Sequence, residues 1–220
     1  IIFFRVNNTK MKLIVFDTET SGLPKNKYSS IYKTSEWPHI LQLSYIVWDL
    51  DNNEIIAQEN DYIKIRTYIK ISKESYNVHK ISKEFLEKNG ISMTIAINKF
   101  IEHMNECNIV VGHNVEFDQK MMNVECYRRS INIEWKPEFC TMKNSVDICK
   151  IEKVNLNNEK YFKYPTLNEL HVYLFKKEPK NLHDALTDIV ICLRCYCKIL
   201  YDRDITKKNK DIAKFIKKIV

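Results

Sequence analysis

The chain has 220 residues, of which 45% are hydrophobic and 11% aromatic, enough for the core of one α/β domain. No apolar run approaches the roughly 20 residues that cross a bilayer, and the opening "IIFF" is too short for a secretion signal. We therefore expect no membrane partner and an intracellular location. The seven scattered cysteines lack the paired spacing of a zinc site, which predicts reduced thiols.

The net charge of +7 is concentrated at the end of the chain. Residues 207–220 contain six lysines and one aspartate, a surplus of five positive charges. Such a tail favours a polyanionic partner, most simply nucleic acid. Met11 stands just before the first long apolar run. The expected organisation is therefore an N-terminal extension over 1–10, one domain over 11–202 and a basic amphipathic C-terminal helix over 203–220.

Three strands are predicted in the first third of the chain. "KLIVF" (12–16) is a continuous apolar, β-branched run of the kind found in a central strand covered on both faces. Residues 39–50 alternate in part between apolar and polar side chains. "DNN" (51–53) has the composition of a turn, and residues 54–65 are predicted to form the returning strand. Together these segments predict an antiparallel meander.

Helices and further strands alternate in the remainder of the chain. Strands are predicted at 109–114 and, in a short form, at 138–142. The predicted helices cover 81–90 (closed by Gly90), 93–107 (capped by Ser92), 115–130, a segment opened by a capping box at 166–169, and 183–200. The fold class is therefore α/β, with a mixed five-stranded sheet, antiparallel meander plus parallel strands, flanked by helices. Arg128 and Arg129 are interpreted as a solvated helix face.

The first strand ends on "FDTETSG" (16–22), which carries two carboxylates, Asp17 and Glu19. Residues two apart in a strand point to the same face, so these acids repel each other and raise each other's pKa. A divalent cation between them would remove that repulsion. The alternative is a turn that carries two solvated acids.

Further candidate ligands stand at the ends of other predicted elements. Asp118 lies in the first turn of the helix that follows "VVGHN", where an ordinary aspartate is also common. Asp188 lies in an apolar stretch of the last long helix, so it needs either exposure or a partner. His183 precedes it by five residues; alone, it is more simply explained as a surface histidine.

The three motifs together resemble the DEDDh 3′–5′ exonucleases, the family of the proofreading subunit of bacterial DNA polymerase III. "FDTETSGL" is similar to the family's first motif, "VVGHNVEFD" to its second and "NLHDALTD" to its third. The resemblance covers roughly residues 12–200 and implies a ribonuclease-H-like fold. It makes residues 11–202 an exonuclease domain.

The resemblance also implies roles for single residues. Asp17, Glu19, Asp118 and Asp188 would hold two divalent cations, Mg²⁺ or Mn²⁺, and His183 would be the general base. The sister DEDDy group has a tyrosine four residues before the last aspartate. That position is Asp184 here, which favours the histidine branch.

Substrate contacts follow from the same resemblance. The pocket for the terminal nucleotide would be lined by Thr20, Leu23, His79, Asn114 and Phe117. Relatives often carry glycine at the position of Lys80, so that loop departs from the family pattern. Independently, the basic tail is predicted to hold substrate beyond the terminal nucleotide through Lys207, Lys208 and Lys210.

The expected activity is metal-dependent hydrolysis from the 3′ end of DNA, single-stranded or frayed, with release of nucleoside 5′-monophosphates. A DNA polymerase is the partner that the resemblance suggests. Two alternatives stay open: an exoribonuclease of the same family, and a non-catalytic domain that binds nucleic acid or a polymerase. A haloacid-dehalogenase phosphatase is disfavoured, because that class needs a second aspartate where this chain has Glu19.

Overall fold

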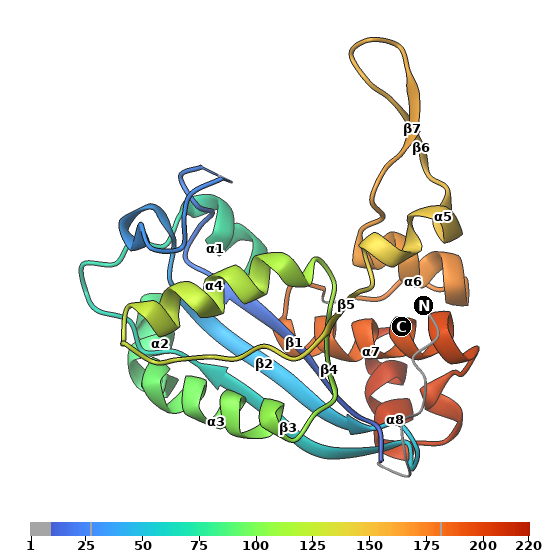
Figure 1. Cartoon of the computed structure of the whole chain (residues 1–220), viewed down its shortest axis with the longest axis horizontal. Helices are drawn as coiled ribbons and strands as arrows, with labels where there is room; N and C mark the ends of the chain where they lie inside the picture. Colours follow the sequence, from blue (N-terminus) through green and yellow to red (C-terminus); the bar gives the residue numbers. More distant parts are fainter. Residues whose placement is uncertain (1–9, 27, 181) are drawn as a thin grey trace.

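The computed structural model describes residues 10–26, 28–180 and 182–220. Residues 1–9 of the expected N-terminal extension therefore lie outside the described part of the chain. A mixed sheet has the order β3-β2-β1-β4-β5, in which β1 pairs antiparallel with β2 and parallel with β4 (Figure 1). Its strands are β1 (Lys12–Thr20), β2 (Ile40–Asp49), β3 (Glu54–Tyr62), β4 (Ile109–Gly112) and β5 (Glu138–Cys140). This is the predicted five-stranded sheet, with its antiparallel meander and parallel strands.

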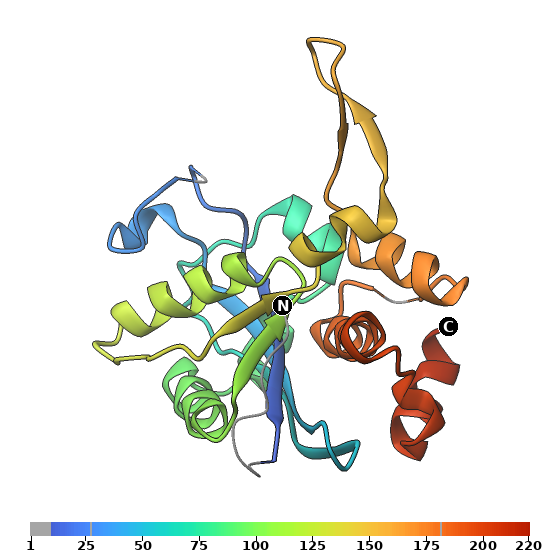
Figure 2. The same cartoon turned by 45° about the vertical axis from the view of Figure 1, so that its right-hand side comes forward.

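Helices cover both faces of this sheet (Figures 1 and 2). One face packs on α3 (Met93–Asn105) and α4 (Val115–Tyr127). The other face is covered by α7 (Ala185–Tyr201), and α6 (Leu167–Phe175) and α8 (Lys210–Ile219) form a further layer outside α7. No helix in the described part of the chain is both long and apolar enough to span a membrane.

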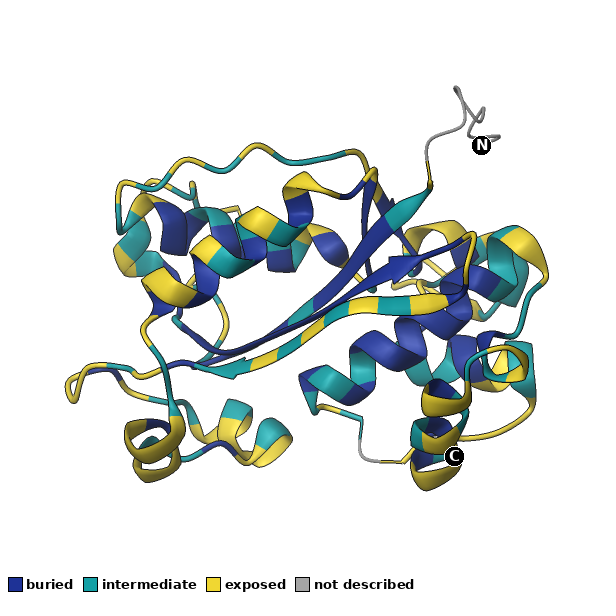
Figure 3. Cartoon of the chain, turned by 90° about the horizontal axis from the view of Figure 1, so that it is seen from below, coloured by how far each residue is buried: buried dark blue, intermediate teal, exposed yellow. Residues whose placement is uncertain are grey.

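Burial follows the position of each strand in the sheet (Figure 3). Every residue of β2 is buried, whereas β3, at the edge, alternates between exposed and half-buried residues. The helix α7 is buried on nearly all sides between Ile189 and Cys197, because it lies between the sheet and the layer formed by α6 and α8. The predicted apolar stripe of the C-terminal helix packs into this core through Ile212, Ile216 and Ile219.

Some short elements were not predicted. These are the helices α1 (Lys73–His79) and α5 (Val146–Cys149) and a two-stranded ribbon of β6 (Glu152–Val154) and β7 (Lys160–Phe162). None of their residues is buried, so their sequences carry no strong hydrophobic period. The predicted helix over 81–90 is the shorter α2 (Lys83–Asn89).

Gly90 closes α2 as predicted, but without the left-handed conformation in which glycine often ends a helix. Its φ of −78° is open to any residue. A β-carbon there would lie 2.4 Å from the carbonyl oxygen of Leu86 and 2.6 Å from the backbone nitrogen of Lys64. Glycine is needed because the chain leaving β3 passes against the end of the helix.

Candidate active site

The strand β1 delivers two acids toward the start of α7. Leu13 and Val15 face the core beneath α7, and the alternation of the strand continues that side through Asp17 and Glu19. Asp188 comes from the first turn of α7. Carboxylate oxygens of Asp17, Glu19 and Asp188 lie within 4.8 Å of one another. Three of the four predicted ligands therefore meet at one point.

Asp118 approaches from the opposite layer. It lies in the first turn of α4 and is buried. Its Oδ1 accepts a hydrogen bond from the backbone N–H of Thr18 (3.1 Å) and another from the Thr18 hydroxyl (2.6 Å). It does not belong to the cluster of three, but its charge is close enough to raise the pKa of Asp17.

The four carboxyl groups are held in an environment that disfavours their charged forms. Burial is the largest cause, and neighbouring carboxylates add to it. The pKa of Asp17 is raised well above its ordinary range, and that of Glu19 is raised to about 8. Burial likewise raises the pKa values of Asp118 and Asp188, each to about 7.

The donor set fits a divalent cation. Carboxylate oxygens are the ligands that Mg²⁺ and Mn²⁺ prefer. Within the described residues, Oδ1 of Asp188 is buried and has no hydrogen-bond partner. A buried acceptor without a partner costs free energy, and a cation among the acids would supply that partner and remove their repulsion.

His183 lies beside this cluster in a constrained conformation. Its φ of 74° is unusual for a residue other than glycine. Its backbone N–H donates to Oδ2 of Asp188 (3.2 Å), and the residue is exposed. Its ring makes no hydrogen bond or ion pair with another described residue. The backbone of His183 is therefore held next to the acids, and its exposed ring is free to meet a substrate or a water.

One polar residue next to the acids, Asp184, was not predicted as part of the site. Asp184 caps α7 by accepting from the backbone and hydroxyl of Thr187. Its Oδ1 also accepts from Nε2 of Gln42 on β2 (3.3 Å), which ties the start of α7 to the sheet. Its charge contributes to the raised pKa of Asp17 and Glu19. The cap signal of an aspartate before "ALT" was available in the sequence, but its partner on β2 was not.

A pocket of about 480 Å³ opens next to Glu19. Four of the five residues predicted to contact the nucleotide line it: Thr20, Leu23, His79 and Phe117. The remaining walls come from Thr18 and from the segment of α1, which supplies Ser72, Glu74, Ser75 and Val78. Asn114 does not line this pocket; it is exposed and begins α4 with a φ of 68°.

Lys80 takes the conformation that glycine would take. Its φ is 60° and its ψ 15°, in the left-handed region, and it ends α1. His79 stays oriented: its Nδ1 accepts from the backbone N–H of Ile81 (2.9 Å), and its Nε2 lies 3.3 Å from the carbonyl oxygen of Thr20. Lysine at position 80 therefore does not prevent the loop from taking this conformation.

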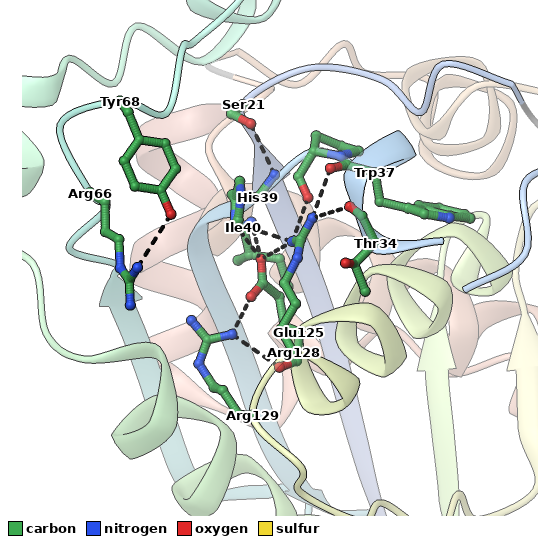
Figure 4. A network of polar contacts seen from close by, with 11 residues as sticks. Ser21, Thr34, Trp37, His39, Ile40, Arg66, Tyr68, Glu125, Arg128 and Arg129 are labelled. Carbon is green, nitrogen blue, oxygen red and sulfur yellow. Dashed lines mark hydrogen bonds and ion pairs between the residues drawn. The ribbon is translucent and has the colours of Figure 1, made fainter. Parts of the chain in front are cut away.

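An ion-pair network around the buried Glu125 holds the loop that follows the first motif (Figure 4). Glu125 of α4 pairs with Arg128 (2.6 Å), Arg129 and His39 (3.1 Å). The backbone N–H of His39 donates to Oγ of Ser21, two residues beyond Glu19. Burial alone would raise the pKa of Glu125, but these partners hold it below its ordinary value. The expectation of a solvated face at Arg128 and Arg129 was wrong, because the network secures the loop between β1 and β2.

The tail lysines lie apart from the nucleotide pocket. Lys207, Lys208 and Lys210 are exposed at the beginning of the C-terminal segment. Lys207 lines a different pocket, of about 370 Å³, between α6, α7 and α8. Its other basic wall residues are Lys177, Arg194, Lys198 and Lys217.

The chain belongs to the exonuclease family, whose model, described as "Exonuclease", matches residues 14–196. Among curated proteins it is similar to DNA polymerase III subunit epsilon of Rickettsia conorii, with 23% identity over 203 residues, 92% of this chain and 80% of that protein. The same subunit of Rickettsia prowazekii is 22% identical over 200 residues, 91% of this chain and 79% of that protein.

Solved structures of exonuclease I share the fold. The apo enzyme superposes with a TM-score of 0.66 at 14% identity, over 94% of this chain and 44% of that one. E. coli exonuclease I in complex with a dA16 oligonucleotide gives 0.62 at 16% identity, over 94% and 45%. This chain therefore has the ribonuclease-H-like exonuclease fold and spans less than half the length of exonuclease I.

Proposed function

We propose that this chain is a metal-dependent 3′–5′ exonuclease of the DEDDh type that releases nucleoside 5′-monophosphates. The observation that carries the proposal is the cluster of Asp17, Glu19 and Asp188, whose oxygens lie within 4.8 Å of one another and include an unpartnered, buried Asp188 oxygen. Membership of the exonuclease family supports it. The retention of all four acids disfavours a purely structural domain.

The residues in and around the cluster would have different chemical roles. Asp17, Glu19, Asp188 and, from α4, Asp118 would hold two divalent cations, Mg²⁺ or Mn²⁺. When bound, such cations supply positive charge that acidifies an attacking water and stabilises the leaving oxygen. His183, exposed beside Asp188, accepts the proton of that water. Thr18 holds Asp118 in place through its two hydrogen bonds.

The neighbouring pocket receives the 3′-terminal nucleotide. Leu23 and Phe117 offer apolar surface for a base or sugar, and Thr20 and His79 offer polar groups. Glu19 belongs both to this pocket and to the acidic cluster. A nucleotide seated there would therefore present its phosphodiester to the carboxylates.

The substrate is proposed to be DNA, single-stranded or with a frayed 3′ end. Relatives named DNA polymerase III subunit epsilon support DNA and a DNA polymerase as partner. Exonuclease I, with the same fold, has been solved with an oligodeoxynucleotide. RNA is the alternative substrate. Contacts to the 2′-hydroxyl distinguish RNA from DNA, and a comparison of activity on the two substrates tests them most directly.

The test is degradation of labelled single-stranded DNA, duplex DNA and RNA with Mg²⁺, with Mn²⁺ or with excess chelator, followed by product analysis. Nucleoside 5′-monophosphates released from the 3′ end, only with metal, are expected. Asp17→Asn should abolish turnover, since it removes a ligand charge at nearly constant volume. Asp147→Asn, an exposed acid on α5, is the matched control and should retain full activity. Undiminished turnover by Asp17→Asn, or in chelator, would overturn the proposal.

A further inference from the structure

The ribbon formed by β6 and β7, here residues 150–164, stands clear of the rest of the molecule (Figures 1 and 2). Its strands pair antiparallel over three residues each, with Lys153 opposite Tyr161 and Glu152 opposite Phe162. All six ladder residues are exposed. A two-stranded ribbon without a packed face is marginally stable in water. The ribbon therefore has a role other than stabilising the core.

Large apolar side chains cover this ribbon although nothing in the described part of the chain buries them. Tyr161, Phe162 and Tyr164 are 47%, 42% and 58% exposed, and Leu156 at the tip is fully exposed. Tyr161 is paired directly with Lys153 in the ladder, so its ring and the lysine extend from the same face of the ribbon. Contiguous exposed apolar surface of this kind marks an interaction site.

The charge of the ribbon favours one kind of partner. It has four lysines and two glutamates, a surplus of two positive charges. Lys153 and Lys150 have no ion-pair partner among the described residues, whereas Lys160 pairs with Glu152. Protein interfaces are depleted in lysine at their centres, whereas surfaces that bind single-stranded nucleic acid combine lysines with unpacked aromatic rings.

The position of the ribbon agrees with this partner. Its last strand leads into Pro165, whose carbonyl oxygen accepts a hydrogen bond from Nε2 of His113 (3.1 Å). Burial lowers the pKa of His113 to about 4, so the neutral ring keeps this contact at physiological pH. His113 is next to Asn114, which begins α4 one turn before Asp118. The ribbon thus rises from the end of the sheet that carries the acids.

We propose that the β6–β7 ribbon binds single-stranded nucleic acid upstream of the 3′ end, by stacking a base on Tyr161 and by contacting a phosphate with Lys153 on the same face. The inference rests on the proposed function for the identity of the strand. It goes beyond it in assigning a second contact surface outside the active site. Exposed aromatic residues on other sheets stack bases in this way.

The experiment measures binding without cleavage. Long oligothymidylate and a thymidine dinucleotide are titrated in chelator onto the parent chain, Tyr161→Ala and Lys153→Gln. Stacking is worth about 1–3 kcal/mol per base, so Tyr161→Ala should bind the long strand at least roughly fivefold more weakly. The dinucleotide, too short to reach the ribbon, should bind equally. Tyr127→Ala, an equally exposed tyrosine on α4, is the control and should change neither affinity.

A second variant guards against collapse of the ribbon. Tyr161→Phe keeps the ring and should bind the long strand like the parent. Unchanged affinity of the alanine variant for the long strand would overturn the ribbon proposal. So would an equal loss on duplex DNA, because paired bases cannot stack on the ring. Turnover of the dinucleotide with Mg²⁺ tests the proposed exonuclease separately, so the two proposals fail on different measurements.

Discussion

Thr18 holds the carboxylate of Asp118 with two hydrogen bonds, one from its backbone N–H and one from its hydroxyl at 2.6 Å. The residue between the two acids of the first motif therefore positions the acid of the second motif. Thr18→Val removes the hydroxyl at nearly constant shape and leaves a buried carboxylate with one partner fewer. We expect a loss of about 1–3 kcal/mol in the free energy of unfolding, measured with urea. Thr18→Ser keeps the hydroxyl and should retain most of that stability; an equal loss in both variants would contradict the role.

The crowding of acids predicts how stability depends on pH. The pKa of Glu19 is about 8 in the folded state, against 4.5 ordinarily. Between these values the unfolded chain has released a proton that the folded chain still holds, so without metal the free energy of unfolding falls as pH rises. One pKa unit corresponds to about 1.4 kcal/mol, so Glu19→Gln should be more stable than the parent at pH 8 by at least that amount.

Urea unfolding in chelator at pH 4.5 and pH 8 checks this, the two values being the ordinary and the raised pKa of Glu19. At the lower pH the parent and Glu19→Gln should have similar free energies of unfolding. Mg²⁺ should stabilise the parent at the higher pH and the variant less. If the difference in the free energy of unfolding between the parent and Glu19→Gln does not depend on pH, the buried acids do not repel one another as proposed.

His183 is expected to act on a proton rather than to hold metal. Replacing a positioned base costs about 10²–10⁴-fold in rate, so His183→Ala should lose that much turnover. Because the residue is exposed and its ring bonds to no other described residue, folding should be unaffected. The discriminating measurement is the rise in melting temperature caused by Mg²⁺. His183→Ala should keep it and Asp188→Asn should lose it; equal losses would make His183 a ligand.

The sheet and the shared face of Asp17 and Glu19 could be predicted because both depend on short-range patterns, whereas the place of Asp188 beside them followed from the family resemblance. The apolar run at 12–16 and the alternation at 39–50 specify buried strands, and acids two apart in a strand must share a face. The capping box at Thr166 and Glu169 forms as expected. In each case the sequence spacing itself sets the geometry, so no knowledge of distant partners is needed.

The rest depends on contacts between residues far apart in the chain. Glu125 binds His39 across 86 positions, and Thr18 binds Asp118 across 100. Neither pairing leaves a periodic signal, so Arg128 and Arg129 were misread as solvated. The ribbon was missed because three-residue strands that bury nothing have no hydrophobic alternation to detect.

The left-handed conformation of Lys80 predicts a gain from glycine. This conformation costs an L-residue about 1–2 kcal/mol, partly offset by the extra freedom of glycine in the unfolded chain. Lys80→Gly should therefore raise the free energy of unfolding by up to about 1 kcal/mol, with turnover unchanged because His79 keeps its contacts. Lys80→Ala is the control and should bring no gain. Destabilisation by glycine would mean that the lysine side chain, not the backbone, secures the loop.

The basic tail gives the last prediction. The apolar stripe of α8 is explained by packing, because Ile212, Ile216 and Ile219 are buried against the core. Packing does not explain the lysines, and Lys207, Lys208 and Lys210 are exposed and form no ion pair with other described residues. We expect them to attract the phosphates of a long substrate, independently of its base sequence.

Changing these three lysines to glutamine should leave the core intact, since none of them is buried. Affinity for long single strands should fall, and the slope of log affinity against log salt should become shallower by about 0.7 for each phosphate that the tail no longer neutralises. Turnover of a dinucleotide should stay the same, because it ends within the nucleotide pocket. Lys88→Gln, exposed on α2, controls for a general decrease in positive charge and should leave the slope unchanged. If the triple variant matches the parent in both affinity and slope, the tail lysines only solvate the surface of α8 and the substrate leaves the domain elsewhere.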